Sequence, residues 1–202
     1  IQDVSHDLAK AFKLKSTKGS LITGIMQDTP AQKAGMRKGD VVIRINDKLI
    51  QNSNHLRNEI ANAGAFAEIE MELIRDGKTV LLKLKLDERP KKIGRMKTSP
   101  EPTQTTEQLE LLGMTVEELT EENAKQLGIE PGIGVVISNV KSGSPAEKSG
   151  LLPGMIVQEA ERQAVSNLDT FKEIINGIDS EQGVLLLIRT SNGSRYIFIQ
   201  EN

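Results

Sequence analysis

The sequence predicts a mixed β protein with short helices, built as two small, partly open β-barrels in tandem. Three observations predict this arrangement: an internal repeat, short β-rich runs bounded by turn residues, and a proline-containing segment between the copies. A chain of 202 residues has room for one or two domains. Charged residues make up 27% of it and hydrophobic residues 37%, which is typical of a globular protein.

The internal repeat has one constant offset of 115 residues, which brings Gly35 onto Gly150. The same offset matches Pro30-Ala31 with Pro145-Ala146, and it continues without a change of register towards both ends. Chance similarity would drift out of register, so we interpret the chain as two copies of one domain. The predicted boundaries are a first domain at residues 1–87, a linker at 88–107 and a second domain at 108–202. Prolines and the lack of apolar periodicity mark the linker.

The first half of each copy predicts a strand, a short helix and a second strand. Residues 21–25 and 135–140 are β-rich runs, and each is followed by a turn that contains a proline. Proline is tolerated in the first turn of a helix, and glycine commonly ends one. We therefore predict short helices at 31–34 and 146–149, and strands at 41–45 and 156–160.

The second half of each copy predicts a longer helix and a hairpin. Residues 52–54 can cap a helix over 56–63, and either Asn167 or Asp169 can cap a helix over 171–176. Asp-Gly and Asn-Gly are strong hairpin signals because both central residues need positive φ. The predicted hairpins join 68–75 to 78–86 and 184–189 to 195–200.

The repeat also predicts that the two copies begin at different points. Ile1 aligns with Val116, but the second copy has an earlier segment, Leu112-Gly113-Met114, with no counterpart after Ile1. We expect the first copy to start one element late, as in a fragment of a longer protein.

Segments 29–40 and 144–154 share the pattern Ser/Thr-Pro-Ala-x-x-Ala/Ser-Gly-aliphatic-x-x-Gly. This pattern resembles the signature of PDZ domains, and two copies in series resemble the C-terminal half of the HtrA (Do, DegP/DegQ-like) serine proteases. The resemblance covers nearly all of the chain outside the linker. Two departures concern local turns: Met155 replaces the usual aspartate, and Glu161 stands where the first copy has Asn46.

The resemblance implies a peptide-binding groove in each copy. Leu112-Gly113-Met114 resembles the loop whose backbone N–H groups hold a chain-terminal carboxylate. The strand that follows, 114–119, would offer a free edge to an antiparallel peptide, and the longer helix would wall the other side. The predicted peptide-binding residues are Leu111, Leu112, Gly113, Met114, Thr115, Val116, Phe171, Ile174, Ile175 and Ile178, with Ile1, Gln2, Asp3, Leu56 and Ile60 in the first copy.

The residues themselves argue against catalysis and against several partner classes. Cysteine is absent, there are two histidines, and no serine-nucleophile or phosphate-binding motif is complete, so we expect no catalytic residue, metal or cofactor. A net charge of −2 and few aromatic residues disfavour nucleic acid. The longest aliphatic run, Val184–Ile188, is too short to span a membrane.

The resemblance implies that the chain is the regulatory, substrate-recruiting part of a periplasmic serine endoprotease in protein quality control and stress response. The expected partners are C-terminal or extended segments of unfolded proteins and an N-terminal protease domain. A trimer or larger homo-oligomer is expected only at full length. Two alternatives stay open: the PDZ pair of a membrane-embedded metalloprotease, and a non-enzymatic scaffold.

Overall fold

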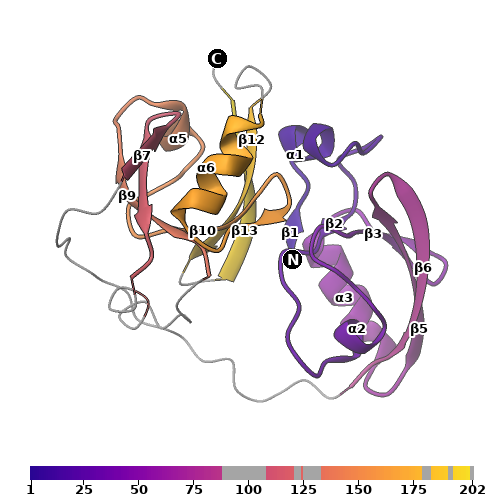
Figure 1. Ribbon diagram of the computed structural model, residues 1–202. Helices are drawn as coiled ribbons and strands as arrows, with labels where there is room; N and C mark the ends of the chain where they lie inside the picture. Colours follow the sequence, from indigo (N-terminus) through magenta and orange to yellow (C-terminus); the bar gives the residue numbers. More distant parts are fainter. Residues whose placement is uncertain (88–107, 121–123, 125–132, 179–182, 191–192, 201–202) are drawn as a thin grey trace. The chain divides into compact units, whose positions relative to one another are not determined.

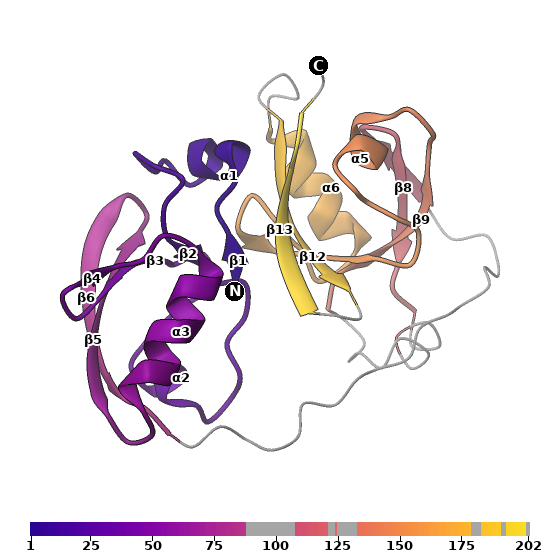
Figure 2. The ribbon, with the colours of Figure 1, turned by 180° about the vertical axis from the view of Figure 1, so that it is seen from behind.

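The computed structural model describes residues 1–87, 108–120, 124, 133–178, 183–190 and 193–200. The chain divides into two compact units, Ile1–Ile93 and Gly94–Asn202, which Figures 1 and 2 show from opposite sides. We call the described residues of the first unit domain 1, and those of the second unit domain 2.

Domain 1 is an antiparallel sheet with three helices. The strand order is β1-β2-β3-β5-β6, and β4 pairs with β3. In chain order the elements are β1 (Gln2–Asp3), α1 (His6–Ala11), β2 (Ser20–Leu21), α2 (Pro30–Lys33), β3 (Val41–Ile45), β4 (Lys48–Leu49), α3 (Ser53–Ala63), β5 (Glu68–Arg75) and β6 (Lys78–Lys85).

Domain 2 repeats this plan with one additional strand at the outer edge of its sheet. The order is β13-β12-β10-β9-β8-β7, and β11 pairs with β10. The elements are β7 (Gln108–Leu111), β8 (Met114–Glu118), β9 (Val135–Val140), α5 (Pro145–Lys148), β10 (Ile156–Ala160), β11 (Gln163–Ala164), α6 (Leu168–Asn176), β12 (Val184–Thr190) and β13 (Gly193–Ile199). The predicted fold class, mixed β with short helices in two partly open copies, is confirmed. Each sheet is antiparallel and stays open in the described strand pairing.

Polar caps fix where the helices begin. The side chains of Thr29 and Ser144 cap α2 and α5, with a proline in the first turn as predicted. Asn52 and Asn167 cap the longer helices α3 and α6. Of the two predicted candidates for the second helix, Asn167 and Asp169, the cap is therefore Asn167. Both longer helices therefore start three residues earlier than the apolar pattern predicted.

The two hairpins form where turn residues predicted them. Asp76 and Gly77 have φ of 52° and 75° between β5 and β6, which is the left-handed pair that such a turn requires. Thr190 pairs with Gly193 in the second hairpin, and residues 191 and 192 lie outside the described residues.

The tight turn after β3 is preserved in domain 2 despite the change of residue. Asn46 and Glu161 both have positive φ, at 48° and 49°. Asn46 Oδ1 accepts from the N–H of Glu70 at 2.9 Å, and Glu161 Oε1 accepts from the N–H of Leu185 at 2.6 Å. The amide oxygen of Asn46 and the carboxylate oxygen of Glu161 thus accept equivalent backbone hydrogen bonds, and the turn geometry is retained.

One strand is shorter than predicted. The sequence predicts an extended strand over 21–25, but β2 ends at Leu21, whereas its counterpart β9 has six residues. Gln2 pairs with Leu21, as Glu117 pairs with Val136. Beyond Leu21 no described residue pairs with the run on its β1 side, whereas β9 is paired by the full length of β8. A strand keeps its ladder only where a neighbour pairs with it.

Each domain buries its own aliphatic core. Leu56 of α3 and Phe171 of α6 occupy equivalent places, with exposed fractions of 2% and 0%. Among the described residues, Phe171 is the bulkiest fully buried side chain, and the other large ones that are fully buried are Leu, Ile and Met.

Candidate functional site

Domain 1 contains an apolar groove of about 460 Å³. Residues from the segment after β2, from α2 and α3, and from the β5–β6 hairpin line it. The apolar residues that form most of its wall are Ile22, Ile25, Met36, Leu56, Ile60 and Met71. A concave surface of this kind is suited to the apolar side chains of a ligand.

Ile1, the residue just before strand β1, lies at one border of this groove. The strand β1 is the outermost strand of its sheet among the described residues, and β2 pairs with its inner side. Ile1, which lines the groove, precedes it and is 38% exposed. Gln2 pairs with Leu21 of β2. An apolar groove beside a strand edge can hold both the side chains and the main chain of an extended peptide.

Asp3, predicted to contact peptide, is placed at the start of α3. Its carboxylate accepts from the backbone N–H of Ser53 at 2.7 Å. This hydrogen bond holds the pKa of Asp3 below its usual range. Glu118 makes the equivalent hydrogen bond in domain 2, where its carboxylate accepts from the N–H of Leu168 at 2.8 Å. Both acids therefore tie the groove strand to the first turn of the longer helix.

The face of α3 that lines the groove carries Leu56 and Ile60. Leu56 is buried and Ile60 is half-buried, so Ile60 is the better placed to touch a ligand. Glu59 is not among the residues that line the groove, and its carboxylate lies 2.7 Å from Lys48 Nζ.

Domain 2 does not present the free strand edge that the sequence predicted. β8 pairs with β9 on one side and with β7 on the other, so both of its edges are used. Leu112 and Gly113 form the two-residue turn between β7 and β8, with φ of 50° and 83°. The segment predicted as a carboxylate-binding loop is thus the turn of a hairpin.

The turn is fixed against the start of α5. The carbonyl of Leu112 accepts from the N–H of Ala146 at 3.2 Å, and that of Gly113 accepts from the N–H of Lys141 at 2.7 Å. A Cβ at Gly113 would lie 2.2 Å from the Cβ of Ser144. Glycine is therefore required here by both its φ and the close approach of Ser144.

The remaining predicted residues of domain 2 separate into two groups. Met114, Val116 and Phe171 are fully buried, and Leu111, Leu112 and Ile175 pack against the same core. Thr115 is half-buried and pairs with Glu110 of β7.

Ile174 and Ile178 line an open hollow of about 670 Å³ beside β11, together with the acidic Glu161 and Glu173. The counterparts of the residues that line the groove of domain 1 are Phe171 and Ile175. Of the four residues of the predicted helix wall, Ile174, Ile175 and Ile178 all pack against the core that contains Phe171, and Ile174 and Ile178 also line this hollow.

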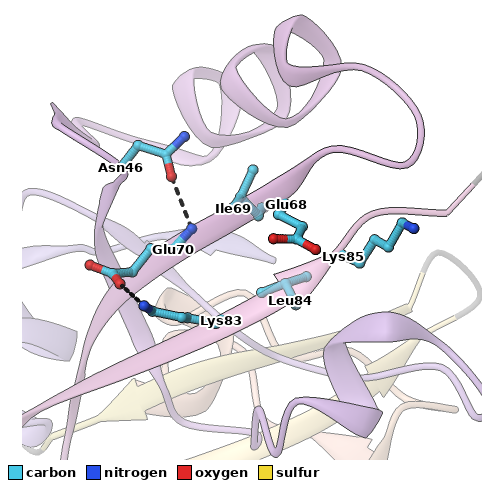
Figure 3. A pocket seen from close by; sticks show the side chains of 7 residues that line it. All are labelled: Asn46, Glu68, Ile69, Glu70, Lys83, Leu84 and Lys85. Atoms are coloured by element: carbon cyan, nitrogen blue, oxygen red, sulfur yellow. Dashed lines mark hydrogen bonds and ion pairs between the residues drawn. The ribbon is translucent and has the colours of Figure 1, made fainter.

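A second hollow in domain 1, of about 430 Å³, lies at the β5–β6 hairpin (Figure 3). Figure 3 shows Lys83 beside Glu70, whose N–H donates to Asn46, and Glu68 near Lys85. Lys83 Nζ lies 3.3 Å from the Glu70 carboxylate. The hollow is lined by two acidic and two basic side chains, so it has no excess charge that would attract a ligand of one sign.

The described residues contain no group of three or more His, Cys, Asp and Glu side chains arranged to hold a metal ion. His6 is exposed at the start of α1. His55 Nδ1 accepts from the N–H of Gln51 at 3.3 Å, and its Nε2 lies 3.6 Å from Glu59. Among the described helices, none is long and apolar enough to cross a membrane.

Comparison with known families shows similarity over both domains. The PDZ domain family matches residues 8–86, and the PDZ-like domain family matches residues 103–181.

Curated relatives match nearly the whole chain. A probable periplasmic serine endoprotease DegP-like from Chlamydia pneumoniae is 29% identical over 201 residues, which are 99% of this chain and 39% of the relative. The protein of the same description from Ectopseudomonas mendocina is 30% identical over 98% of this chain and 41% of its own length. The chain thus spans about two fifths of the length of these relatives.

Two solved structures show partial similarity. The HtrA-type protease AlgW with a tripeptide is 26% identical, with a TM-score of 0.39 over 45% of this chain and 30% of that chain. The HtrA3 PDZ domain bound to a phage-derived ligand is 17% identical, with a TM-score of 0.39 over 48% of this chain and 88% of that chain.

Proposed function

Both domains of this chain belong to the PDZ family, and on that premise we propose that the chain binds extended segments of unfolded polypeptides in the groove of domain 1. The single observation that carries this proposal is the apolar groove of about 460 Å³ beside the outer edge of β1. A peptide would add to that edge by main-chain hydrogen bonds, and one or two apolar side chains would enter the groove.

Individual residues take definite roles in this proposal. Ile1 borders the groove just before strand β1, Ile60 contacts the ligand's side chain, and Leu56 forms the floor of the groove. Asp3 positions the strand against α3 and does not itself touch the ligand.

The relatives support a wider role in substrate recruitment. They are described as periplasmic serine endoproteases, and this chain matches about two fifths of their length. We infer that the chain recruits unfolded polypeptide for a serine protease domain in the periplasm. The protease domain, substrates and any oligomer are expectations for such a larger protein.

The proposal is tested with a fluorescent peptide of alternating valine and serine that ends in leucine. We expect binding by anisotropy, with shifted NMR amide signals at β1, β2 and α3. Ile60→Lys should weaken binding at least tenfold because a charge replaces the apolar contact. Asn58→Lys adds the same charge on the exposed side of α3 and is the matched control.

Two results would contradict the proposal. One is unchanged affinity in the Ile60→Lys chain when circular dichroism shows it to be folded. The other is equal weakening by both lysine variants, which would indicate a general charge effect. A peptide with an amidated C-terminus should bind as well as the free acid. The proposed contacts are main-chain hydrogen bonds and the packing of apolar side chains, and neither involves a terminal carboxylate.

A further inference from the structure

The two domains differ at one equivalent position, which is open in domain 1 and filled in domain 2. With the repeat offset of 115 residues, Met26, Thr29 and Ala31 correspond to Lys141, Ser144 and Ala146. The first three line the apolar groove of domain 1. Their counterparts in domain 2 touch the turn between β7 and β8, through two hydrogen bonds and the close approach to Gly113.

The strand β7 meets the requirements for a ligand of this site. It runs antiparallel to β8 and pairs with it through four residues, Gln108 to Leu111, on the edge opposite to β9. This is the edge and the direction that an added peptide strand would take. Leu111 and Leu112 also pack against the core cluster that contains Phe171, so apolar side chains accompany the main chain into the site.

We propose that β7 is an internal ligand that occupies the peptide site of domain 2, and that an external peptide binds there only by displacing it. The proposal rests on the proposed function, because it assigns to domain 2 the same mode of strand addition. Domain 1 is then the open receptor and domain 2 the self-occupied one. The occupant is continuous with the chain, so its effective concentration at the site is high and independent of dilution.

The first test weakens β7 alone. In a hairpin with a two-residue turn, the two residues that flank the turn form a hydrogen-bonded pair, which here is Leu111 and Met114. Hydrogen-bonded and non-hydrogen-bonded pairs alternate along the strands, so Leu109 and Val116 form the next hydrogen-bonded pair. Leu109→Pro removes that donor, whereas Glu110→Pro changes a neighbouring position whose N–H points away from β8. We expect the alternating valine and serine peptide to bind domain 2 at least tenfold more tightly in the Leu109→Pro chain, with shifted amide signals in β8 and α6. The Glu110→Pro chain should behave like the parent.

A second variant covers the case in which proline unfolds domain 2. The chain contains no cysteine, so Glu110→Cys with Thr115→Cys introduces one facing pair across β7 and β8. In the reduced chain a high concentration of peptide should shift the β8 signals. Oxidation locks β7 in place and should weaken that binding at least tenfold. Equal shifts in both redox states, or none in either, would overturn the proposal.

The same titrations separate the two proposals. Signals at β1 and α3 report peptide binding to domain 1, which neither variant touches. Binding at domain 1 without any gain at domain 2 in a folded Leu109→Pro chain would overturn the internal-ligand proposal and leave the proposed function standing. Absence of binding at domain 1 would instead contradict the proposed function.

Discussion

At the residue scale, an ion pair between a buried carboxylate and a partly buried arginine distinguishes the two domains. Asp40 is fully buried and accepts from the Arg75 guanidinium at 2.7 Å through both oxygens, and also from the N–H of Arg37. The carboxylate holds the pKa of Arg75 above its usual value. Domain 2 has Met155 in place of Asp40, and there Arg195, from β13, donates to the carbonyl of Gly150 at 2.9 Å.

We expect Arg75→Met to lower the free energy of unfolding of domain 1 by about 3–5 kcal/mol, because the buried Asp40 carboxylate loses its charged partner and keeps only the N–H of Arg37. Arg195→Met is the matched control and should cost about 1 kcal/mol, since it removes only a donor to the neutral carbonyl of Gly150. The double variant Asp40→Met with Arg75→Met should recover most of the loss, as domain 2 does with Met155. Urea unfolding followed by NMR checks all three, and a double variant less stable than Arg75→Met would refute this account.

A second prediction at this scale concerns two glycines of domain 2. Gly113 and Gly143 have φ of 83° and 78°, but a Cβ would be crowded only at Gly113. Gly143→Ala should cost about 1 kcal/mol for the left-handed conformation alone. Gly113→Ala should cost at least a further 2 kcal/mol or so, because Ser144 must move. Equal losses in thermal unfolding would show that the crowding is relieved without strain.

At the scale of elements, two acids fasten a groove strand to a helix. Asp3 accepts a hydrogen bond from Ser53, so its pKa is lowered in the folded state. A lowered folded pKa contributes stability above the unfolded value of about 3.9, and that contribution is lost as pH falls through the folded pKa. We expect the melting temperature of domain 1 to fall below about pH 4, and Asp3→Asn to make this part of the pH profile flatter. Parallel profiles for the two chains would contradict the assignment.

The sequence predicted correctly those elements that a few adjacent residues determine. It failed for features that depend on which strand pairs with a segment in the folded sheet. Caps at Asn52 and Asn167, prolines at helix starts and the Asp76-Gly77 turn are each read from a few adjacent residues. The end of β2 depends on which strand lies beside it, and the pairing of β8 depends on β7. The Leu112-Gly113-Met114 pattern fits either a loop or a hairpin turn, because both need positive φ at glycine. Only the pairing partner distinguishes them.

At the scale of the whole molecule, each domain has a separate core, with Leu73 and Ile188 at equivalent, fully buried positions. Leu73→Ala should cost domain 1 about 2–5 kcal/mol, and Ile188→Ala should do the same to domain 2. Hydrogen exchange should show lost protection only in the domain that carries the change. Loss of protection in both domains from either substitution would mean that they unfold as one cooperative unit.

The direction of β7 has a mechanical consequence. Its first residue, Gln108, pairs with Glu117 at the open end of the hairpin, and its last, Leu111, pairs with Met114 beside the turn. A load applied to the chain on the N-terminal side of Gln108 would peel the pairs one at a time from the open end towards the turn. An incoming peptide strand could exchange by the same route, gaining each pair as β7 releases it. Tension on this side of domain 2 would therefore raise the rate at which β7 leaves the site and a peptide replaces it.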